Sequence, residues 1–532
     1  MATTSFMEKL KSLPAKLYIL LIVCTLGGSV LGIDTALVSG AQLFFITRFH
    51  LDTSLHGLTI AATMLGALVG AILSTVLNKY VGRKGAMFFG GIDALAAGLI
   101  EAFSNIWGVL LLGRLILGIC FGIMTSTIPI YLAECAPTDV RGIFTTVYQL
   151  AYAFGYFIGL IVDVIFVHVE HGWRFMLGSV IVPASLVTCG LFFAEESPRW
   201  LLARRRENAA WNALRKMRSS EELATQDFDM MRQFLEKERQ TTKEQPGFFR
   251  TLYEKPSVRR PVMLGIALQI AQQFCGVNAV MFYFDYVLQL AGMTASRSID
   301  VSVALGFATV LFTFPTFWLI DRFGRRIVLL STMPFLSVML WVCGFSFFGG
   351  TKIREALNIV GTLLFRFFYG PGLGPVPWVI VAEIYPWYVR SQCLTLNSFA
   401  CYMLNFVVSF SWPTMLKSMH AQGAYSFFAG FTLLSTCFIY LFVPETKGVE
   451  MEAIQELFQY PLYTIAKKNV SETKAYMSKV SWFRRWVGGN GGEQERTFEK
   501  DRKKPVQDDY KESVGIDEQE RVATCGASSS KF

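Results

Sequence analysis

The chain has 532 residues, of which 53% are hydrophobic and 17% are charged, and its mean hydropathy is +0.41. This composition excludes an ordinary soluble globular protein and indicates a polytopic membrane protein. The formal net charge of +9 does not indicate a nucleic-acid partner, because the basic residues cluster in loops beside the apolar runs, as on the cytoplasmic side of membrane proteins.

The first apolar run, about 17–40, contains an acid, Asp34, with apolar sequence on both sides. On translocon-based scales an Asp at the centre of a transmembrane helix costs about 2.5–3.5 kcal/mol, so such a residue is by default a functional candidate. The alternative interpretation is that Asp34 lies at a helix end and faces water. The run is too long for a signal peptide, so we expect it to be retained as the first span.

Apolar runs long enough to cross a bilayer recur along the chain and fall into two groups of six. We place them near residues 17–40, 57–78, 86–104, 107–129, 144–167, 174–194, 261–288, 301–320, 327–349, 356–381, 392–416 and 423–443. The predicted fold is therefore an all-α membrane protein with twelve transmembrane helices in two six-helix bundles. Basic loops at Arg83, Arg205 and Arg325 fall on the same side as the N-terminus, so both termini are expected to be cytoplasmic.

The spans divide the chain into four predicted segments. Residues 1–194 and 261–443 form the two bundles. Residues 195–260 mix charged and apolar positions and are predicted to form short amphipathic helices under the membrane, as a lid or clamp, with docking of a partner protein as the alternative. Residues 444–532 form a cytoplasmic tail that is expected to be disordered after about Gly488.

An internal repeat relates the two halves. Three short motifs of the first half recur in the second half in the same order, at offsets of roughly 240–250 residues. The pairs are Gly82-Arg83-Lys84 with Gly324-Arg325-Arg326, Ala133-Glu134 with Ala382-Glu383, and Glu196 with Glu445. This order predicts two similar bundles related by an axis along the membrane normal.

These motifs and several others resemble the sugar porter family of the major facilitator superfamily, from about Leu17 to Gly448. The matching segments are Asp321-Arg322-Phe323-Gly324-Arg325-Arg326, Glu196-Ser197-Pro198-Arg199-Trp200, Gln272-Gln273 with Gly276-Val277-Asn278, Gly374-Pro375-Val376-Pro377-Trp378, and Pro444-Glu445-Thr446-Lys447-Gly448. The resemblance implies the major facilitator fold in a lipid bilayer and transport by alternating access. Within the spans the sequence offers no nucleophile with a base and no metal-binding cluster, so we expect neither an enzyme nor a cofactor nor a metal site.

Sugars and cyclic polyols carry hydroxyl groups that both donate and accept hydrogen bonds, so their site needs amides and indole or phenol edges with little formal charge. The resemblance implies that the substrate is bound by Gln149, Gln272, Gln273, Asn278, Trp378 and Asn405. The alternative is that the paired amides join helices to one another.

Breaks in the seventh and tenth spans are expected to serve as gate hinges, because broken helices at membrane depth occur where backbone lines a cavity. The hinge residues are Gly276, Gly374, Pro375 and Pro377, with simple packing as the alternative. The resemblance also implies a cytoplasmic latch of ion pairs that joins the two halves when the inner side is closed. Its residues are Arg83, Glu134, Arg141, Arg325, Glu383 and Arg390, with a role only in topology as the alternative.

Asp34 stands where proton-coupled sugar porters have an acid, and its expected partner is Arg114, which we take as the other intramembrane charge of the first half. Burial and a nearby guanidinium act on a carboxyl in opposite directions, so a change in their separation can load and release a proton. A permanent salt bridge is the alternative. Asp285 and Arg366 echo this pair in the second half, and we expect them to pair on the outer side and stabilise one gate state.

The motifs Gly32-Ile33-Asp34-Thr35 and Glu383-Ile384-Tyr385-Pro386 look most like those of the proton/myo-inositol cotransporters. We therefore expect a proton symporter of a small neutral cyclic polyol or monosaccharide, with myo-inositol first, in the plasma membrane or an intracellular membrane. A hexose transporter, either proton-coupled or facilitative, is the second hypothesis. A non-transporting nutrient sensor is the hypothesis from another class, and the proton pair and the latch argue against it.

Overall fold

The computed structural model describes residues 14–137, 141–244, 248–386 and 388–447, together with parts of 449–473. All the regular structure within these residues is helical. The tail after about Gly488, which we expect to be disordered, lies outside the described residues, and so does the side chain of Arg141.

The N-terminal half runs from α2 to α8. Its helices are α2 (Ala15–Phe49), α3 (Thr53–Tyr80), α4 (Gly82–Ala102), α5 (Trp107–Cys135), α6 (Arg141–Phe166), α7 (Gly172–Gly178) and α8 (Ile181–Phe193), of which the last two form one span. The turn after α2 is fixed by Asp52, whose carboxylate accepts the N–H of Leu55 at 2.7 Å and so caps the start of α3.

Short helices connect the two halves. They are α9 (Pro198–Ala203), α10 (Glu207–Lys216), α11 (Glu221–Glu244) and α12 (Phe248–Glu254). The first of them begins at a proline, and the hydroxyl of Ser197 caps it by accepting the N–H of Trp200.

The C-terminal half runs from α13 to α21. Its helices are α13 (Pro256–Gln273), α14 (Val277–Phe282), α15 (Phe284–Ala291), α16 (Ala295–Thr313), α17 (Pro315–Phe323), α18 (Arg325–Phe345), the 3-10 turn η1 (Ser346–Phe348), α19 (Thr351–Tyr369), α20 (Val376–Ile384) and α21 (Arg390–Phe442). The seventh span is interrupted at Gly276, which has a φ of 77° that favours glycine, and the tenth span is interrupted between α19 and α20. A role of these interruptions in gating stays a prediction.

Ten helices of the described chain are long and apolar enough to cross a membrane. One of them, α21, contains two predicted spans, because the backbone leaves the helical conformation at His420. The remaining span is formed by α19 and α20, and α19 is the less apolar because it carries Lys352, Arg354, Glu355 and Arg366. The prediction of an all-α membrane protein with twelve spans is confirmed.

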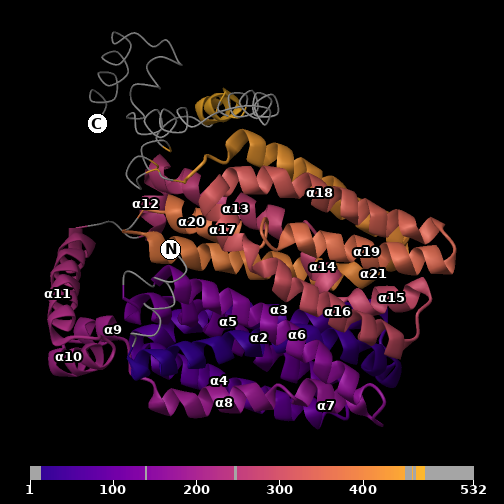
Figure 1. The fold of residues 1–532 in the computed structure, drawn as a ribbon, viewed down its shortest axis with the longest axis horizontal. Helices are drawn as coiled ribbons and strands as arrows, with labels where there is room; N and C mark the ends of the chain where they lie inside the picture. The colour runs from indigo at the N-terminus through magenta and orange to yellow at the C-terminus, as the bar shows by residue number, and fades with distance from the viewer. Residues whose placement is uncertain are drawn as a thin grey trace, which may run out of the picture.

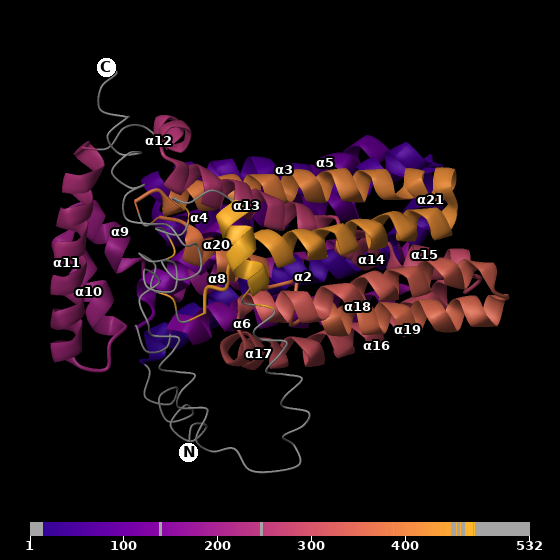
Figure 2. The same cartoon turned by 90° about the horizontal axis from the view of Figure 1, so that it is seen from above.

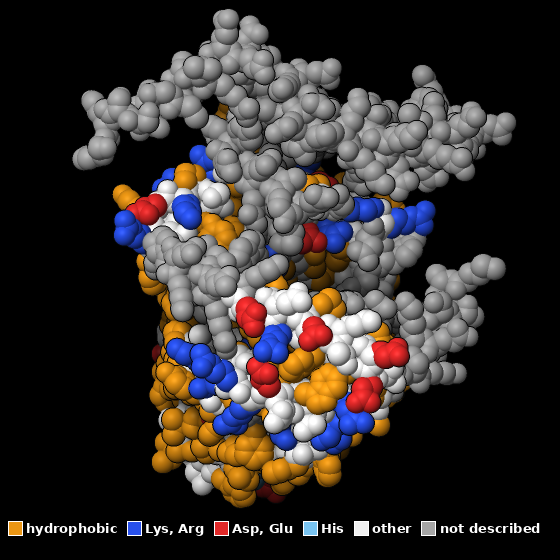
Figure 3. All heavy atoms as spheres, turned by 90° about the vertical axis from the view of Figure 1, so that its left-hand side faces the viewer, with side chains coloured by type: hydrophobic (Ala, Val, Ile, Leu, Met, Phe, Trp, Pro, Cys, Tyr) orange, Lys and Arg blue, Asp and Glu red, His pale blue; other side chains and the backbone are white. Residues whose placement is uncertain are grey.

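The two halves lie side by side along their length (Figure 1). In Figures 1 and 2, helices α9 to α12 lie at one end of the spans, which we call the linker end, and we call the opposite end the far end. Where the halves meet, α3 packs against α21 and α6 packs against α16. Figure 3 looks at the linker end, where charged side chains gather beside hydrophobic flanks. Apolar side chains such as Phe103, Val182 and Phe192 are more than half exposed, as expected of a surface that lipid covers.

A glycine allows the closest crossing between α2 and α6. At Gly32, an added Cβ atom would collide with the backbone oxygen of Tyr152. Backbone atoms cannot move aside as a side chain can, so any substituent would push the two helices apart. The crossing also places Asp34, two residues further along, in the interior.

We expect Gly32→Ala to destabilise the protein by about 1–3 kcal/mol, because overpacking forces backbone shifts. The measurement is the thermal unfolding midpoint of the purified protein in detergent. Gly430→Ala on α21 is the matched control, since an added Cβ there meets no atom within 4 Å. Equal midpoints for the two variants would contradict this account of the crossing.

Candidate functional site

A cluster of two acids and one base lies buried in the N-terminal half. Arg114 of α5 donates a hydrogen bond to Asp34 of α2, with Nη1 2.5 Å from Oδ1. The same nitrogen lies 3.8 Å from Oε1 of Glu101 on α4. None of the three side chains is more than 2% exposed. The expected contact between Asp34 and Arg114 is present, and its role in proton coupling stays a prediction.

This cluster contains one more acid than base. Within the described residues, neither carboxylate oxygen of Glu101 accepts a hydrogen bond. Taking an ion out of water costs several kcal/mol even after the protein relaxes, so an uncompensated buried charge is unfavourable. One proton on either acid makes the cluster neutral, and the geometry can therefore hold a proton together with the guanidinium.

The repeated sequence motifs meet at the linker end in both halves. In each half, a glutamate that follows the last span accepts two backbone N–H groups of the loop after the second span: Glu196 from Arg83 and Lys84 (2.9 and 3.2 Å), and Glu445 from Arg325 and Arg326 (2.9 and 3.1 Å). Gly82 and Gly324 start these loops with φ of 94° and 95° and lie against the carboxylates, so a side chain would collide there.

Glu196 lies outside the spans, between α8 and α9. Burial raises the pKa of its carboxyl above the usual value, although the N–H groups of Ser197, Lys84 and Arg83 oppose this shift. The residue therefore keeps its proton to a higher pH than a free glutamate does.

The residues of the expected latch pair within each half. Arg83 Nη2 lies 2.7 Å from Glu134 Oε1, and Arg325 Nη2 lies 2.9 Å from Glu383 Oε1. Arg390 donates to the backbone oxygen of its near neighbour in sequence, Tyr385, at 3.3 Å. These contacts tie neighbouring loops of the same half together. A latch between the halves stays a prediction, and the side chain of Arg141 lies outside the described residues.

Three of the amides expected to bind substrate form a chain of hydrogen bonds. Asn278 donates to Gln273, and Gln273 Nε2 lies 3.5 Å from Gln272 Oε1. Gln272 in turn donates to the backbone oxygens of Leu373 and Gly374 at 2.9 and 2.7 Å. The chain therefore connects the break in the seventh span to the break in the tenth. Gln272 joins helices in this structure, as the alternative interpretation of the paired amides proposes.

The other expected binders stand apart from this chain. Asn405 accepts a hydrogen bond from its own helix at 3.1 Å. The side chains of Gln149 and Trp378 make no hydrogen bond to any residue that the structure describes, and Trp378 is 38% exposed. α21 nevertheless lies beside the amide chain, because Gln273 donates to the sulfur of Cys401, one helical turn before Asn405, at 3.2 Å.

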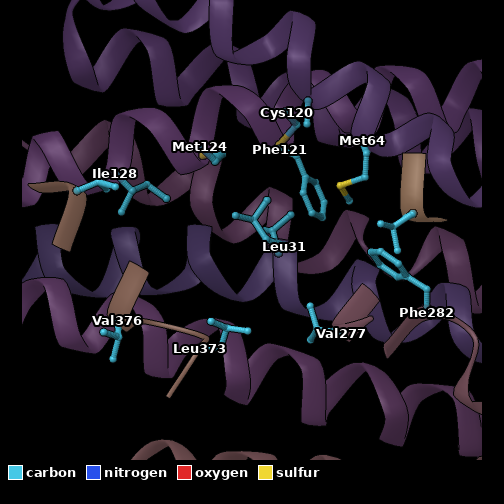
Figure 4. Packing of buried hydrophobic residues seen from close by; sticks show 14 of the residues in the cluster. Leu31, Met64, Cys120, Phe121, Met124, Ile128, Val277, Phe282, Leu373 and Val376 are labelled. Atoms are coloured by element: carbon cyan, nitrogen blue, oxygen red, sulfur yellow. The ribbon is translucent and has the colours of Figure 1, made fainter. Parts of the chain in front are cut away.

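Apolar side chains from both halves surround these polar groups. Figure 4 shows Leu31, Phe121 and Met124 of the first half gathered near Val277 and Leu373 of the second. The polar side chains of the hydrogen-bonded chain described above are amides rather than ions. Such a lining suits a neutral ligand that carries several hydroxyl groups.

Hydrogen bonds also join the halves toward the far end. Ser39 donates to Asp285 at 2.7 Å, and Gln42 donates to the backbone oxygen of Phe282 at 2.6 Å. The ring of His56 lies 2.9 Å from the side-chain oxygen of the same glutamine. We call this set of contacts between α2, α3, α14 and α15 the far junction.

The expected ion pair between Asp285 and Arg366 is wrong for this structure. Arg366 instead donates to Thr309 at 3.0 Å and to the hydroxyl of Tyr156 at 2.8 Å. Asp285 accepts from two serines, one on α2 and one on α16. Hydroxyl groups satisfy each charge, so the two side chains need not touch.

The sequence interpretation missed Glu101 and Asp163, which are both completely buried. They lie within the predicted spans 86–104 and 144–167. The cost of an acid at membrane depth, which singled out Asp34, applies equally to both of them. Arg114 is therefore not the other intramembrane charge of the first half but one of several.

Comparison with known proteins covers most of the chain. Residues 20–458 match the family model described as "Sugar (and other) transporter". The galactose-proton symporter of Escherichia coli K12 is 31% identical over 448 residues, which cover 84% of this chain and 95% of that protein. The human proton myo-inositol cotransporter is 27% identical over 547 aligned positions, covering 86% and 84%. The solved structure of the proton:xylose symporter XylE bound to 6-bromo-6-deoxy-D-glucose has a TM-score of 0.70 and 26% identity, covering 84% of this chain and 99% of that one.

We expect Arg114→Met to destabilise the protein by about 3–5 kcal/mol, because it leaves Asp34 and Glu101 buried without a cation. The thermal unfolding midpoint of the purified protein checks this, with Arg48→Met as control, since Arg48 is exposed at the end of α2. The double variant Arg114→Met with Asp34→Asn should lose less than the sum of the single losses, because one of the stranded charges is removed. Additive losses would contradict the coupling of these residues.

Proposed function

Since the chain belongs to the sugar porter family of the major facilitator superfamily, we propose that it is a proton-coupled symporter of a small neutral cyclic polyol or monosaccharide, with myo-inositol as the favoured substrate. As a member of this family it is a multi-pass membrane transporter and not an enzyme. The observation that carries the proton coupling is the buried cluster of Asp34, Glu101 and Arg114, which has one acid too many for its single base.

In this proposal the proton binds to Asp34. Protonation removes the negative charge that holds Arg114 Nη1 at 2.5 Å, so the guanidinium moves toward Glu101, which is 3.8 Å away from the same nitrogen. The three side chains stand on α2, α5 and α4, so a shift of Arg114 changes the packing of all three helices. This is how a proton on one side chain would bias the arrangement of the N-terminal half.

The substrate would lie against the amide chain. Asn405 and Gln149 keep amide N–H groups that no described residue accepts, and these groups are suited to hydroxyl oxygens. Asn278 and Gln273 already hold each other in position. Trp378 is partly exposed and can present an apolar face to a ring, as a cyclic polyol requires.

Alternating access would use the contacts at the two ends of the spans. The far junction, including Ser39 with Asp285, holds the halves together at one end in this structure. The linker end, which we take as the cytoplasmic side, would open and close with latch pairs formed between the halves. Gly276 and Gly374 lie at the helix breaks that would bend.

Among possible substrates, myo-inositol is supported by the motifs around Asp34 and by the likeness to the human proton myo-inositol cotransporter. A hexose is the second candidate, and the likeness to the galactose-proton symporter supports it. Both are neutral rings with several hydroxyl groups, so the amide lining suits either.

The experiment that tests the proposal measures uptake of labelled myo-inositol and glucose into proteoliposomes, with and without an inward proton gradient. We expect the wild type to accumulate myo-inositol above its external concentration only with the gradient. Asp34→Asn should lose this accumulation and keep at most passive exchange, because it cannot bind the proton. Asp300→Asn is the matched control, since this acid is exposed on α16.

Equal uptake with and without the gradient in the wild type would contradict proton coupling and favour a facilitator. Gradient-driven accumulation of glucose but not of myo-inositol would favour the hexose hypothesis.

A second prediction concerns the substrate site. We expect Asn405→Ala to raise the KM for the transported substrate by roughly threefold to tenfold, because a hydrogen bond between neutral groups contributes about 0.5–1.5 kcal/mol. Asn212→Ala on the exposed surface of α10 is the control. An unchanged KM for Asn405→Ala would remove this residue from the site.

A further inference from the structure

Asp163 is a buried acid whose surroundings differ from those of Asp34. It lies near the far end of α6 and is 0% exposed. Among the described residues, no side-chain donor reaches either of its carboxylate oxygens, and the backbone N–H of Gly40 on α2 is the donor that lies close to it. The backbone of α2 at Gly40 is so close that an added Cβ atom would lie 2.5 Å from Asp163 Oδ2. The carboxyl group is thus enclosed by protein, and no side chain of the described residues donates a hydrogen bond to it.

A second acid, Asp285 of α15, lies across α2 from Asp163. Ser39, which precedes Gly40, donates to Asp285 at 2.7 Å, and Ser302 of α16 donates to its other oxygen. Because Ser39 and Gly40 are adjacent residues, both acids lie beside the same turn of α2. Since Asp163 belongs to the N-terminal half and Asp285 to the C-terminal half, bringing the halves together at the far junction also brings two acids together.

The charged and titratable groups around this pair do not neutralise it. Arg366 of α19 is the cation that acts electrostatically on Asp285, but its guanidinium donates hydrogen bonds to Thr309 and to Tyr156. On α3, His56 lies between the rings of Tyr283 and Tyr286, with centroids at 5.3 and 5.1 Å, and contacts the side chain of Gln42. At the far ends of α16 and α19, Arg297 pairs with Glu355. One base thus faces two acids here, as it does at Arg114.

We propose that Asp163 is a second proton-binding site, which holds a proton while the halves are in contact at the far junction and releases it when they separate there. In the release step the O–H bond of the carboxylic acid breaks, the proton passes to water, and Asp163 remains as a carboxylate. Closure of the junction reverses this step. The proposal rests on the transport cycle proposed above, but it depends neither on Asp34 nor on the identity of the substrate.

The hydrogen bonds decide which of the two acids carries the proton. Asp285 accepts two hydroxyl donors, which stabilise its charged form. Asp163 has no side-chain donor and only the backbone N–H of Gly40 close by among the described residues, and a buried carboxylate with so few donors is more costly than a neutral carboxylic acid in the same place. Repulsion from Asp285 acts in the same direction. Opening the junction lets water reach Asp163, and hydration then removes the cost of its negative charge.

This site makes closure of the far junction depend on pH. The closed arrangement binds one proton more than the open one, so acid favours closure and alkali favours opening. A neutral residue of the same shape at position 163 should keep the junction closed at every pH, because it imitates the protonated acid.

The test measures the separation of the halves with spin labels on His168→Cys and Ser296→Cys, which lie on opposite halves at the far end, 3.4 Å apart at their closest polar atoms. The exposed cysteines Cys189 and Cys437, and Cys525 of the tail, are replaced by serine in this background. Distances are recorded by electron paramagnetic resonance in proteoliposomes without substrate, at acidic and at alkaline pH.

We expect a short distance in acid and a growing long-distance population in alkali for the otherwise unchanged chain. Asp163→Asn should show the short distance at both pH values. The exposed control Asp300→Asn should keep the pH dependence. The proposal is overturned if Asp163→Asn keeps the full pH dependence of the distance. It is also overturned if His56→Gln loses this pH dependence while Asp163 is unchanged.

Asp285→Asn provides a second variant if Asp163→Asn does not fold. It removes the repulsion and leaves Asp163 buried, so the alkaline opening should be smaller than in the unchanged chain. An opening of equal size contradicts the proposed role of the acid pair. Loss of gradient-driven uptake in Asp34→Asn is measured separately, so failure of that coupling is distinguishable from failure of this site.

Infrared spectroscopy locates the proton directly. We expect the carboxylic acid C=O absorption at neutral pH to be weaker in Asp163→Asn than in the unchanged chain, with the absorption from the cluster of Asp34, Glu101 and Arg114 remaining. A band that persists in Asp163→Asn with the same intensity overturns the assignment.

Discussion

A guanidinium buried inside a membrane-spanning bundle needs polar partners within reach of its own side chain, because its burial without them is costly. Arg114 meets this requirement with Asp34 at 2.5 Å, and the helices around it are arranged to allow that contact. The close contact at Gly32 brings α2 against α6, and Asp34 is buried in the interior. The additional acid, Glu101, leaves the cluster with two acids and one base.

The two halves hold their loops at the linker end with the same contacts, but the partners of their buried arginines differ. Both use a glutamate to hold the N–H groups of a loop that begins with a left-handed glycine, Gly82 or Gly324. Inside the bundles, Arg114 is paired with acids, whereas Arg366 is satisfied by the hydroxyls of Thr309 and Tyr156. The internal repeat therefore preserves the loop contacts of each half, while the partners of the buried arginines differ between the halves.

The chain of amides and the helix breaks are physically connected. Gln272 donates to the backbone oxygens of Leu373 and Gly374, which an unbroken helix would use internally. The break in the tenth span thus gains hydrogen-bond partners from the seventh span, and Gln273 and Asn278 extend the same chain of amides. A ligand that bonds these amides would act on both breaks together, which links binding to the movement of the halves.

The sequence alone determined the spans, the repeat and the placement of Asp34 within an apolar run, because hydropathy and motif spacing are local properties of the chain. It also indicated that Arg114 would be the partner of Asp34. Only the tertiary structure decided that Glu101 shares this arginine, that Arg366 bonds hydroxyls and not Asp285, and that Asp163 faces the backbone of Gly40. These contacts join helices far apart in sequence. Their partners depend on the rotation and crossing of each helix, which periodicity within a single helix does not specify.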